Sequence, residues 1–357
     1  MPLLLHVFSS FAVGGQQIRF AALAGAFGAR YRHIVLAMDG EFACATRLAP
    51  ELDIRCLPVE VTKHATLANV RWFRHRLCAI APDLLVTYNW GAIEWAMANI
   101  PRRIRHIHVE DGFGPEERSH QFRRREWIRR IVLARSLVAV PSRTLWRIAT
   151  EAWRLHPSRV RYVPNGVDIG RFAGPHHGGP EPVIGTVTAL RPEKNVARLL
   201  RAFRLVVNET PARLVIAGDG PERLALERLA GELGLADRVR FTGNVDEPWK
   251  LYRMFDVFAL SSDTEQMPLS LIEAMASGVP AAATDVGDVG ATLAAENQDF
   301  ITPLDDAALA RAMVTLLRNA NLRAVVGGAN RLKAVREFDQ SSMVSAWGAL
   351  FDGASVA

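Results

Sequence analysis

The most informative stretch of the chain is VFALSSDTEQMPLSLIEAMASGVPAAAT, residues 257–284. Val257–Leu260 is a short apolar run, residues 269–277 read as a helix that ends at Gly278, and Ala281–Thr284 is a second short apolar run. Apolar runs this short, with a helix between them, are typical of buried parallel strands in a βαβ unit. The stretch therefore predicts an α/β protein built on a parallel sheet.

The same alternation of apolar runs and helical segments extends through the rest of the chain. A chain of 357 residues is too long for one ordinary hydrophobic core and about right for two. Residues 174–180, GPHHGGP, have the composition of a linker, and the alternation begins again after them. The predicted strands are residues 3–9, 33–37, 84–86, 105–109, 137–140, 183–188, 213–217, 239–241, 257–260 and 281–284.

This order of elements predicts two facing, doubly wound Rossmann-like domains with a ligand cleft between them. The N-terminal domain is expected over residues 1–172 and the C-terminal domain over residues 173–337. We expect residues 338–357 to form a last helix that packs back on the N-terminal domain.

Composition excludes several other classes of protein. Hydrophobic residues make up 49% of the chain and charged residues 22%, which is typical of a globular protein and not of a disordered one. No run approaches the ~18 apolar residues that a membrane span needs, and the N-terminus reads as a first strand instead of a signal peptide. Cys44, Cys56 and Cys78 cannot all pair, and no two have C-x-x-C spacing, which favours a reduced cytosolic chain without a disulfide or zinc site.

Charge is distributed unevenly between the two halves of the chain. Residues 1–170 contain 24 Arg and Lys against 14 Asp and Glu, whereas residues 171–357 contain 19 against 23. We therefore expect the N-terminal half to face an anionic partner, for which nucleic acid, anionic lipid and a phosphorylated substrate all qualify.

The basic residues concentrate between Arg118 and Arg135, where seven arginines and one glutamate occur among 18 residues. On a helical wheel Trp127, Ile128 and Ile131 share one arc, and most of the arginines take the other. A basic amphipathic helix of this kind is typical of binding to an anionic membrane surface. An ordinary docking helix with solvated cations is the alternative. No nucleic-acid-binding module accompanies the segment, so we expect no nucleic-acid partner.

Two carboxylates bracket the start of the helix predicted in the opening stretch. Glu265 lies in the loop after the strand, and Glu273 lies about one turn into the helix. Free backbone N–H groups at a helix start form a natural diphosphate site, and carboxylates beside it can accept hydrogen bonds from the hydroxyls of a polyol. A loop carboxylate and a solvated helix residue would share this spacing, so spacing alone leaves both interpretations open.

Glu265 and Glu273, with the AMASGVP that follows at 274–280, resemble the donor signature of the family-4 glycosyltransferases, which have the two-domain GT-B fold. Four such segments in the right order make a specific match that extends over nearly the whole chain. The other three segments that resemble this family are VPNGVD at 163–168, VIAGDGPE at 215–222 and FTGNV at 241–245.

The resemblance implies a group 1 glycosyltransferase of the hexosyltransferase type that needs no metal cofactor. It would move a sugar from a UDP- or GDP-linked donor to a glycan or lipid-linked acceptor, with retention of configuration. The setting that the resemblance implies is the biosynthesis of a surface polysaccharide or glycolipid, in the cytoplasm at the inner face of the membrane.

Most of the donor contacts that the resemblance implies lie in the C-terminal domain. Glu273 would hold the ribose hydroxyls, and Glu265 would hydrogen-bond the transferred sugar. Pro268 also suits the first position of the helix. The remaining donor contacts are Val245, in the loop against the base, and Met267, Pro268 and Leu269, whose backbone would meet the sugar and the phosphate.

Two cations, Arg191 and Lys194, follow the first predicted strand of the C-terminal domain. Cations in such a loop stabilise the charge of a departing diphosphate, so both are candidate catalytic and donor-binding residues. The family commonly has its Arg five residues before its Lys. Here that position is Ala189, and Arg191 lies three residues before Lys194. Two solvated loop cations are the alternative.

The N-terminal domain contributes fewer candidates. Gly15 lies in the first strand-to-helix turn, where the backbone can approach a ligand closely, and the resemblance implies that it neighbours the diphosphate. His108 would face the donor sugar from the acceptor side, with His106 expected on the opposite face of the strand. Asp111 and the neighbouring Glu110 are candidates to orient the acceptor hydroxyl or assist its deprotonation, Asp111 the more favoured. His106 and His108 lack a third ligand, so we expect no metal site.

Other functions fit parts of the sequence. A GT-B-like sugar-nucleotide epimerase would need an acid–base set of its own, and a phosphorylase would need a cofactor-binding Lys in a longer chain. A dinucleotide oxidoreductase is disfavoured because no G-x-G-x-x-G is present. A non-catalytic sugar- or anion-binding protein is disfavoured by the intact set of Lys194, Glu265 and Glu273. The chain reads GDVGA at 287–291 where many relatives have Gly-Gly followed by Pro-Glu, which leaves the donor sugar open.

Overall fold

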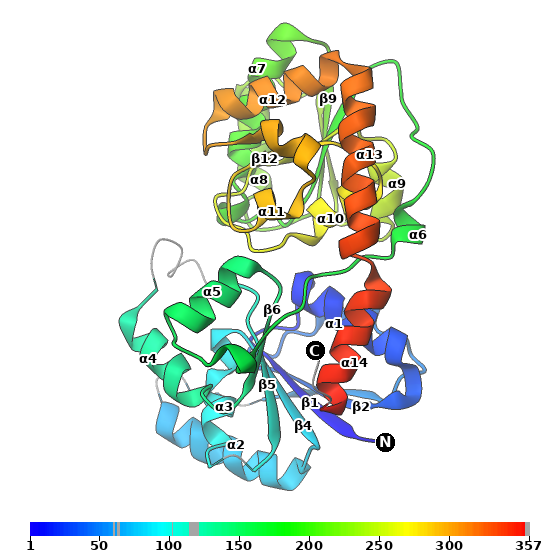
Figure 1. The fold of residues 1–357 in the computed structure, drawn as a ribbon. Coiled ribbons are helices and arrows are strands. Elements are labelled where there is room, and N and C mark those ends of the chain that lie inside the picture. The colour runs from blue at the N-terminus through cyan, green and yellow to red at the C-terminus, as the bar shows by residue number, and fades with distance from the viewer. Residues whose placement is uncertain (60, 63–64, 102, 114–120, 354–357) are drawn as a thin grey trace. The chain divides into compact units, whose positions relative to one another are not determined.

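The computed structural model of the chain describes residues 1–59, 61–62, 65–101, 103–113 and 121–353. It divides the chain into two compact units, Met1–Pro164 together with Met343–Ala357, and Asn165–Ser342 (Figure 1). Arg118, at the start of the predicted basic segment, lies outside the described residues.

The first unit is built on a parallel sheet of seven strands, in the order β3-β2-β1-β4-β5-β6-β7. Its strands are β1 (Leu3–Phe8), β2 (Arg32–Ala37), β3 (Ile54–Pro58), β4 (Leu84–Tyr88), β5 (Arg105–Val109), β6 (Leu137–Val140) and β7 (Val160–Tyr162). Its helices are α1 (Gly15–Phe27), α2 (Thr66–Ile80), α3 (Ile93–Ala98), α4 (Arg123–Val132), α5 (Arg143–Glu151) and α14 (Gln340–Asp352).

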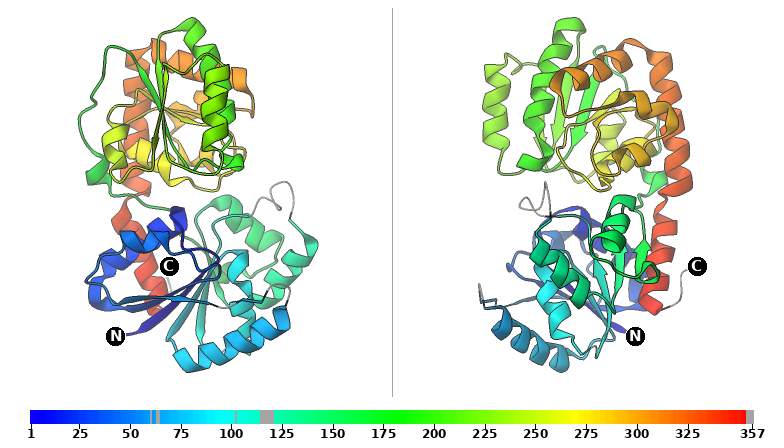
Figure 2. Two further views of the ribbon diagram at one scale, coloured as in Figure 1. Left: turned by 180° about the vertical axis from the view of Figure 1, so that it is seen from behind. Right: turned by 60° about the vertical axis from the view of Figure 1, so that its left-hand side comes forward.

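Helices cover both faces of this sheet, as the alternation of side chains along β1 shows. Leu4 and Phe8 belong to a core shared with α1 and α14, whereas Leu5 and Val7 belong to a core shared with α2 and α3. The views from behind and from the side show the helices on either side of the strands (Figure 2).

The second unit contains a parallel sheet of six strands, in the order β10-β9-β8-β11-β12-β13. Its strands are β8 (Val183–Val187), β9 (Arg213–Ala217), β10 (Val239–Gly243), β11 (Val257–Leu260), β12 (Ala281–Thr284) and β13 (Ile301–Thr302). Its helices are α6 (Ile169–Phe172), α7 (Val196–Glu209), α8 (Arg223–Glu232), α9 (Pro248–Tyr252), α10 (Leu269–Ala276), α11 (Val289–Thr292), α12 (Asp306–Arg318) and α13 (Ala320–Glu337). One core lies under α7 and α12 and another under α10, so the prediction of two Rossmann-like α/β domains is confirmed.

Residues 165–172 belong to the second unit, although the sequence assigns them to the N-terminal domain. Ile169 and Phe172 are buried in the core of the second unit, and this packing fixes the segment there. The chain therefore leaves the first unit at Pro164, ahead of the Gly- and Pro-rich residues 174–180.

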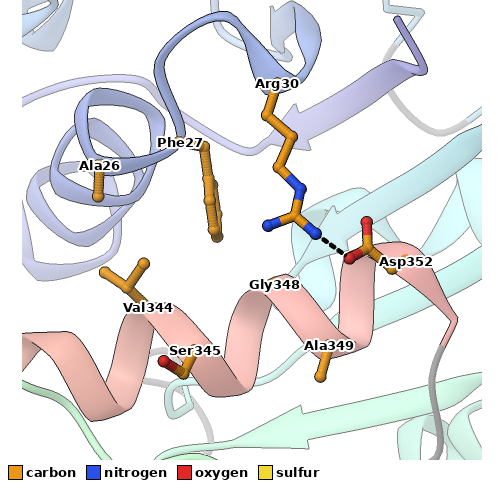
Figure 3. A pocket seen from close by; sticks show the side chains of 8 residues that line it. All are labelled: Ala26, Phe27, Arg30, Val344, Ser345, Gly348, Ala349 and Asp352. Carbon is orange, nitrogen blue, oxygen red and sulfur yellow. Dashed lines mark hydrogen bonds and ion pairs between the residues drawn. The ribbon is translucent and has the colours of Figure 1, made fainter.

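Helix α14 completes the core of the first unit. Trp347 and Phe351 are buried among side chains of β1 and α1. Tyr31 Oη donates a hydrogen bond to Asp352 Oδ1 at 2.7 Å, and Arg30 forms an ion pair with the same carboxylate. Figure 3 shows this ion pair beside an open pocket that is lined by α1, Arg30 and α14.

Each sheet has one point at which the strand order reverses. In the first sheet β1 lies between β2 and β4, and in the second sheet β8 lies between β9 and β11. Ligands of open α/β sheets bind beside the carboxyl ends of the strands at such switch points. A ligand site is therefore expected at the loops that follow these strands in each unit.

Candidate functional site

The loops after β8 and β11 meet at the switch point of the second sheet. Lys194, in the loop after β8, places its Nζ 2.6 Å from Oε1 of Glu265, in the loop after β11. Ser262 Oγ donates a hydrogen bond to the same oxygen at 2.7 Å. The side chain of Lys194 is 23% exposed and that of Glu265 is 9% exposed, so the pair lies at the border of the solvent. The structure thus brings together two predicted donor contacts that are 71 residues apart in the sequence.

Glu273 lies on α10, where a buried tyrosine holds its carboxylate. Tyr252 Oη, from α9, lies 2.8 Å from Glu273 Oε2 and 3.0 Å from the carbonyl oxygen of Ser270. Burial raises the pKa of Glu273 to about 7, although the hydrogen bond from Tyr252 opposes this shift. The carboxyl group therefore changes its charge close to neutral pH. Tyr252 could not be predicted as a partner of Glu273, because nothing in its local sequence indicates a contact with α10.

The segment between Glu265 and Glu273 is held through a backbone carbonyl group. Asn165 Nδ2 donates a hydrogen bond to the carbonyl oxygen of Met267 at 2.8 Å, and the Met267 side chain is buried. Pro268 precedes Leu269, the first helical residue, so the prediction that Pro268 opens the helix is wrong by one position. Its backbone is extended, with φ −69° and ψ 123°, and it leads the chain into α10.

Two further predicted donor contacts lie on loops at the carboxyl ends of the strands. Arg191 is exposed in the loop after β8, and Val245 is half-buried in the loop between β10 and α9. Both positions follow the carboxyl end of a parallel strand. Arg191 follows β8 at the switch point, whereas Val245 follows the edge strand β10.

Gly287, in the loop after β12, packs against the backbone that carries Glu265. Its φ is +56°, and a Cβ atom built there would lie 1.9 Å from the carbonyl oxygen of Glu265. Asp288 N donates a hydrogen bond to the carbonyl oxygen of Gln266 at 3.1 Å. The glycine therefore allows a third loop to support the loop of Glu265, a reason for its presence that the sequence does not reveal.

In the first unit, Asp111 is held by a buried arginine near the start of α1. Nη1 and Nη2 of Arg19 each donate to one carboxylate oxygen of Asp111 at 2.6 Å. Asp111 N donates to Asn89 Oδ1 at 2.8 Å, and Gly15 is exposed at the first position of α1. The two bonds from Arg19 orient the carboxylate of Asp111. Arg19 could not be predicted from the sequence, because its partner Asp111 lies on a distant loop.

His108 lies on β5, and its side chain has no exposed surface. His108 Nδ1 and His106 Nε2 each lie 2.8 Å from Thr87 Oγ1. The two histidines therefore share one face of β5, as residues two apart on a strand do, and the prediction that placed His106 on the opposite face is wrong. His108 Nε2 lies 3.7 Å from Oε2 of the buried Glu110. A sugar could touch His108 only after this packing had rearranged, so a direct role for His108 stays a prediction.

Arg129, on α4, is buried although the helical wheel places most arginines of this segment toward solvent. Its guanidinium carbon lies 5.0 Å from the ring centre of Trp90, 5.3 Å from that of Phe113 and 4.9 Å from that of Trp153. Its Nε lies 3.4 Å from Oε2 of Glu110. A buried carboxylate requires a counter-charge, and Arg129 supplies it.

Two features are absent from the described part of the chain. Within it, no three His, Cys, Asp or Glu side chains are grouped as metal ligands would be. No helix there is long and apolar enough to cross a membrane. The absence of a metal requirement stays a prediction.

Comparison with known proteins gives matches over most of the chain. Residues 13–171 match the family described as Glycosyltransferase Family 4, and residues 172–333 match the family described as Glycosyl transferases group 1. The N-acetyl-alpha-D-glucosaminyl L-malate synthase of Bacillus anthracis is 30% identical over 172 residues, which cover 48% of this chain and 45% of that protein. The phosphatidyl-myo-inositol mannosyltransferase of Mycobacterium leprae is 35% identical over 195 residues, which cover 51% of this chain and 50% of that protein. The chain thus spans about half the length of the curated relatives it matches.

Among solved structures, HepE of Anabaena in complex with UDP and glucose has the same fold. The match has a TM-score of 0.83 and covers 99% of this chain and 100% of that chain, at 19% sequence identity.

Proposed function

This chain belongs to the group 1, family 4 glycosyltransferases, and we propose that it transfers a sugar from a nucleotide-sugar donor to a hydroxyl group of a glycan or lipid-linked acceptor. The observation that carries the proposal is the meeting of Lys194 and Glu265 at the switch point of the second sheet, with Glu273 in the helix that follows. A cation suits a diphosphate, and carboxylates suit the hydroxyls of a ribose and a sugar. The complex of HepE with UDP and glucose supports this class of donor, which we take to be UDP- or GDP-linked.

In this proposal the second unit binds the donor. Glu273 accepts hydrogen bonds from the ribose hydroxyls, while Tyr252 fixes one of its carboxylate oxygens. Lys194 leaves Glu265 for the diphosphate, where Arg191 joins it, and Glu265 then accepts hydrogen bonds from the transferred sugar. The ion pair of the free protein keeps both groups in place until the donor separates them.

The reaction that we propose is a transfer with retention of configuration. The acceptor oxygen forms a bond to the anomeric carbon while the bond from that carbon to the diphosphate oxygen breaks. The acceptor proton passes to the leaving diphosphate on the same face, and Lys194 and Arg191 stabilise the charge that develops there. On the acceptor side, Asp111 orients the hydroxyl. An NMR spectrum of the product is expected to show the anomeric configuration of the donor, and excess EDTA is expected to leave the rate unchanged.

Thermal unfolding in the presence of UDP, GDP and their sugar conjugates tests the donor site. A ligand at about 100 times its Kd stabilises a protein by about 2.7 kcal/mol, which gives a clear shift in Tm. We expect a shift with the nucleotides of one base, and we expect Glu273→Ala to abolish it. Glu232→Ala, which removes an exposed carboxylate at the end of α8, is the control and is expected to keep the shift. If no nucleotide shifts the Tm of the folded wild-type protein, the donor-site assignment is wrong.

We also propose that α4 binds the anionic surface of a membrane, at the cytoplasmic face where a lipid-linked acceptor would lie. Trp127 is 61% exposed and Ile131, one turn later, is 64% exposed. Arg123 and Arg124 are exposed at the start of the helix. Ile128 is half-buried and packs against a hydrophobic core of the first unit. The helix is thus anchored on one side and presents apolar and cationic side chains on the other, a combination that suits anionic lipid.

Vesicle flotation tests this surface. We expect the protein to float with vesicles that contain phosphatidylglycerol and to stay behind with pure phosphatidylcholine, because the arginines need an anionic partner. The double variant Trp127→Ser/Ile131→Ser is expected to lose flotation. Leu332→Ser, at a 73% exposed apolar position on α13, is the matched control. Equal flotation of the double variant and the wild type would refute membrane binding through α4.

A further inference from the structure

A buried ion pair beside Lys194 and Glu265 is not among the proposed donor contacts. Asp263, in the loop after β11, accepts a hydrogen bond from Arg198 Nη1 at 2.6 Å. Asn195 Nδ2 lies 3.0 and 3.1 Å from the two carboxylate oxygens of Asp263. The side chains of Arg198 and Asp263 are 9% and 10% exposed, so neither is placed to meet a ligand in solvent.

Hydrogen bonds to backbone carbonyl groups join the same two loops. Asp263 N donates a hydrogen bond to the carbonyl oxygen of Glu193 at 2.9 Å, and Ser261 Oγ donates to that of Lys194 at 3.1 Å. Arg198 Nη1 also donates to the carbonyl oxygen of Ser261 at 2.8 Å. The loop of Lys194 and the loop of Glu265 are therefore bonded to each other on both sides of Lys194.

Asn195 shows that this arrangement fixes the backbone next to Lys194. Its φ of 42° and ψ of 51° are left-handed, and its Oδ1 accepts a hydrogen bond from Arg198 N at 3.0 Å at the start of α7. Asn195 thus caps the helix with one side-chain atom and binds Asp263 with the other. A buried ion pair contributes little stability compared with an apolar pair of the same volume, so the geometry that it imposes is the more informative property.

We propose that Arg198 and Asp263 are positioning residues of the donor site. They hold the loop after β8 against the loop after β11, and this fixes the spacing at which Lys194 meets the diphosphate and Glu265 meets the sugar. The inference rests on the proposed function of the same site. Glu273 lies on a separate element and is held by Tyr252, so its contact with the ribose does not depend on this pair.

Calorimetric titration with a nucleoside diphosphate and the corresponding monophosphate tests the inference, with UDP and UMP or with GDP and GMP according to the base that the wild type binds. Asp263→Asn removes one charge of the pair and leaves Arg198 without it. Arg198→Met/Asp263→Leu removes both charges, so it leaves no unpaired charge buried and can be used if the single variant fails to fold. We expect the affinity of the double variant for the diphosphate to fall about tenfold or more, which corresponds to the loss of one charge-assisted hydrogen bond. Affinity for the monophosphate is expected to change less than about twofold, because Glu273 is untouched.

Glu181→Gln provides the matched control. Glu181 forms an ion pair with Arg213 at 2.7 Å. It precedes β8, so it lies at the amino ends of the strands, away from the loops of Lys194 and Glu265. Its loss is expected to change neither affinity. The positioning role is wrong if the double variant binds the diphosphate as the wild type does, or if it loses affinity for both nucleotides equally. A wild-type protein that binds neither nucleotide would overturn the proposed function itself and the inference with it.

Discussion

Glu273 is expected to bind the ribose of the donor, and its pKa is unusual for a glutamate. Burial raises its pKa from 4.5 to about 7. An acid whose pKa rises on folding stabilises the fold in its protonated form, so this contribution is full below about pH 4.5 and is lost as the pH rises to about 7. A shift of this size corresponds to a change of about 3 kcal/mol in the free energy of unfolding.

Glu273→Gln is expected to remove this pH dependence, because the amide does not ionise. The Tm of the variant minus that of the wild type, measured without nucleotide, should increase from about pH 5 to about pH 8. Taking this difference cancels the contributions of all other titrating groups. Glu232→Gln, on the surface of α8, should give the same difference at both pH values. A difference for Glu273→Gln that does not depend on pH would contradict the raised pKa.

His33 acts on stability in the opposite direction. His33 Nδ1 lies 3.1 Å from Nε2 of the buried His6, and burial lowers the pKa of His33 to about 4. A histidine whose pKa falls on folding contributes stability that is present above about pH 6.5 and is lost as the pH falls to about 4.

Urea unfolding of His33→Gln tests this contribution. Between about pH 7.5 and pH 5, the wild type is expected to lose about 2 kcal/mol more of its free energy of unfolding than the variant does. His75→Gln, which removes an exposed histidine on α2, is expected to behave as the wild type. Equal losses in wild type and His33→Gln would show that His33 keeps its ordinary pKa in the fold.

At the scale of elements, the loop after β12 supports the loop of Glu265 only if position 287 has no side chain. Gly287→Ala would place a methyl group against the carbonyl oxygen of Glu265 at a left-handed φ. We expect a loss of about 1–3 kcal/mol in the free energy of unfolding, together with weaker binding of the nucleotide sugar.

Gly328→Ala is the matched control for this substitution. Gly328 lies inside α13, and a Cβ atom there would meet no atom within 4 Å. Alanine is favoured over glycine in a helix interior by about 1 kcal/mol, so this variant should be slightly more stable than the wild type. Urea unfolding and calorimetric titration give both quantities, and two glycine variants of equal stability would contradict the close approach of the loops.

At the scale of the whole molecule, the two units differ in how the chain builds them. The second unit is one continuous segment, whereas the first unit needs residues from both ends of the chain. Trp347 of α14 is fully buried in the first unit, and truncating a buried Trp to Ala alone costs about 3–5 kcal/mol. Residues 1–164 therefore lack a part of their own core.

This difference predicts how fragments behave. Residues 165–342 are expected to unfold cooperatively by themselves and to bind the nucleoside diphosphate, because Lys194, Glu265 and Glu273 all lie within them. Residues 1–164 are expected to lack a cooperative transition, and joining residues 339–353 to them through a flexible linker is expected to restore it. Circular dichroism on heating measures each transition, and a cooperative transition of the 1–164 fragment alone would contradict the role of α14.

The class of fold can be predicted from the sequence alone, because buried parallel strands read as near-continuous apolar runs. Val257–Leu260 and Ala281–Thr284 form strands with the predicted bounds. Three strands were not predicted, β3, β7 and β13, and each lies at an edge of its sheet. An edge strand pairs on one side only and is less completely buried, so it carries a weaker apolar pattern. The family also follows from the sequence, because the four segments that resemble it are local stretches that occur in the right order along the chain.

Which side chains act together is visible only in the folded chain. The pairs Lys194 with Glu265, Tyr252 with Glu273 and Arg19 with Asp111 join residues that lie on different elements. The burial of Arg129 follows from the buried carboxylate of Glu110, which no helical wheel can show. Hydrophobic periodicity reports the environment of one element at a time, whereas these ion pairs and hydrogen bonds depend on how strand order and loop packing bring distant segments to the same edge of a sheet.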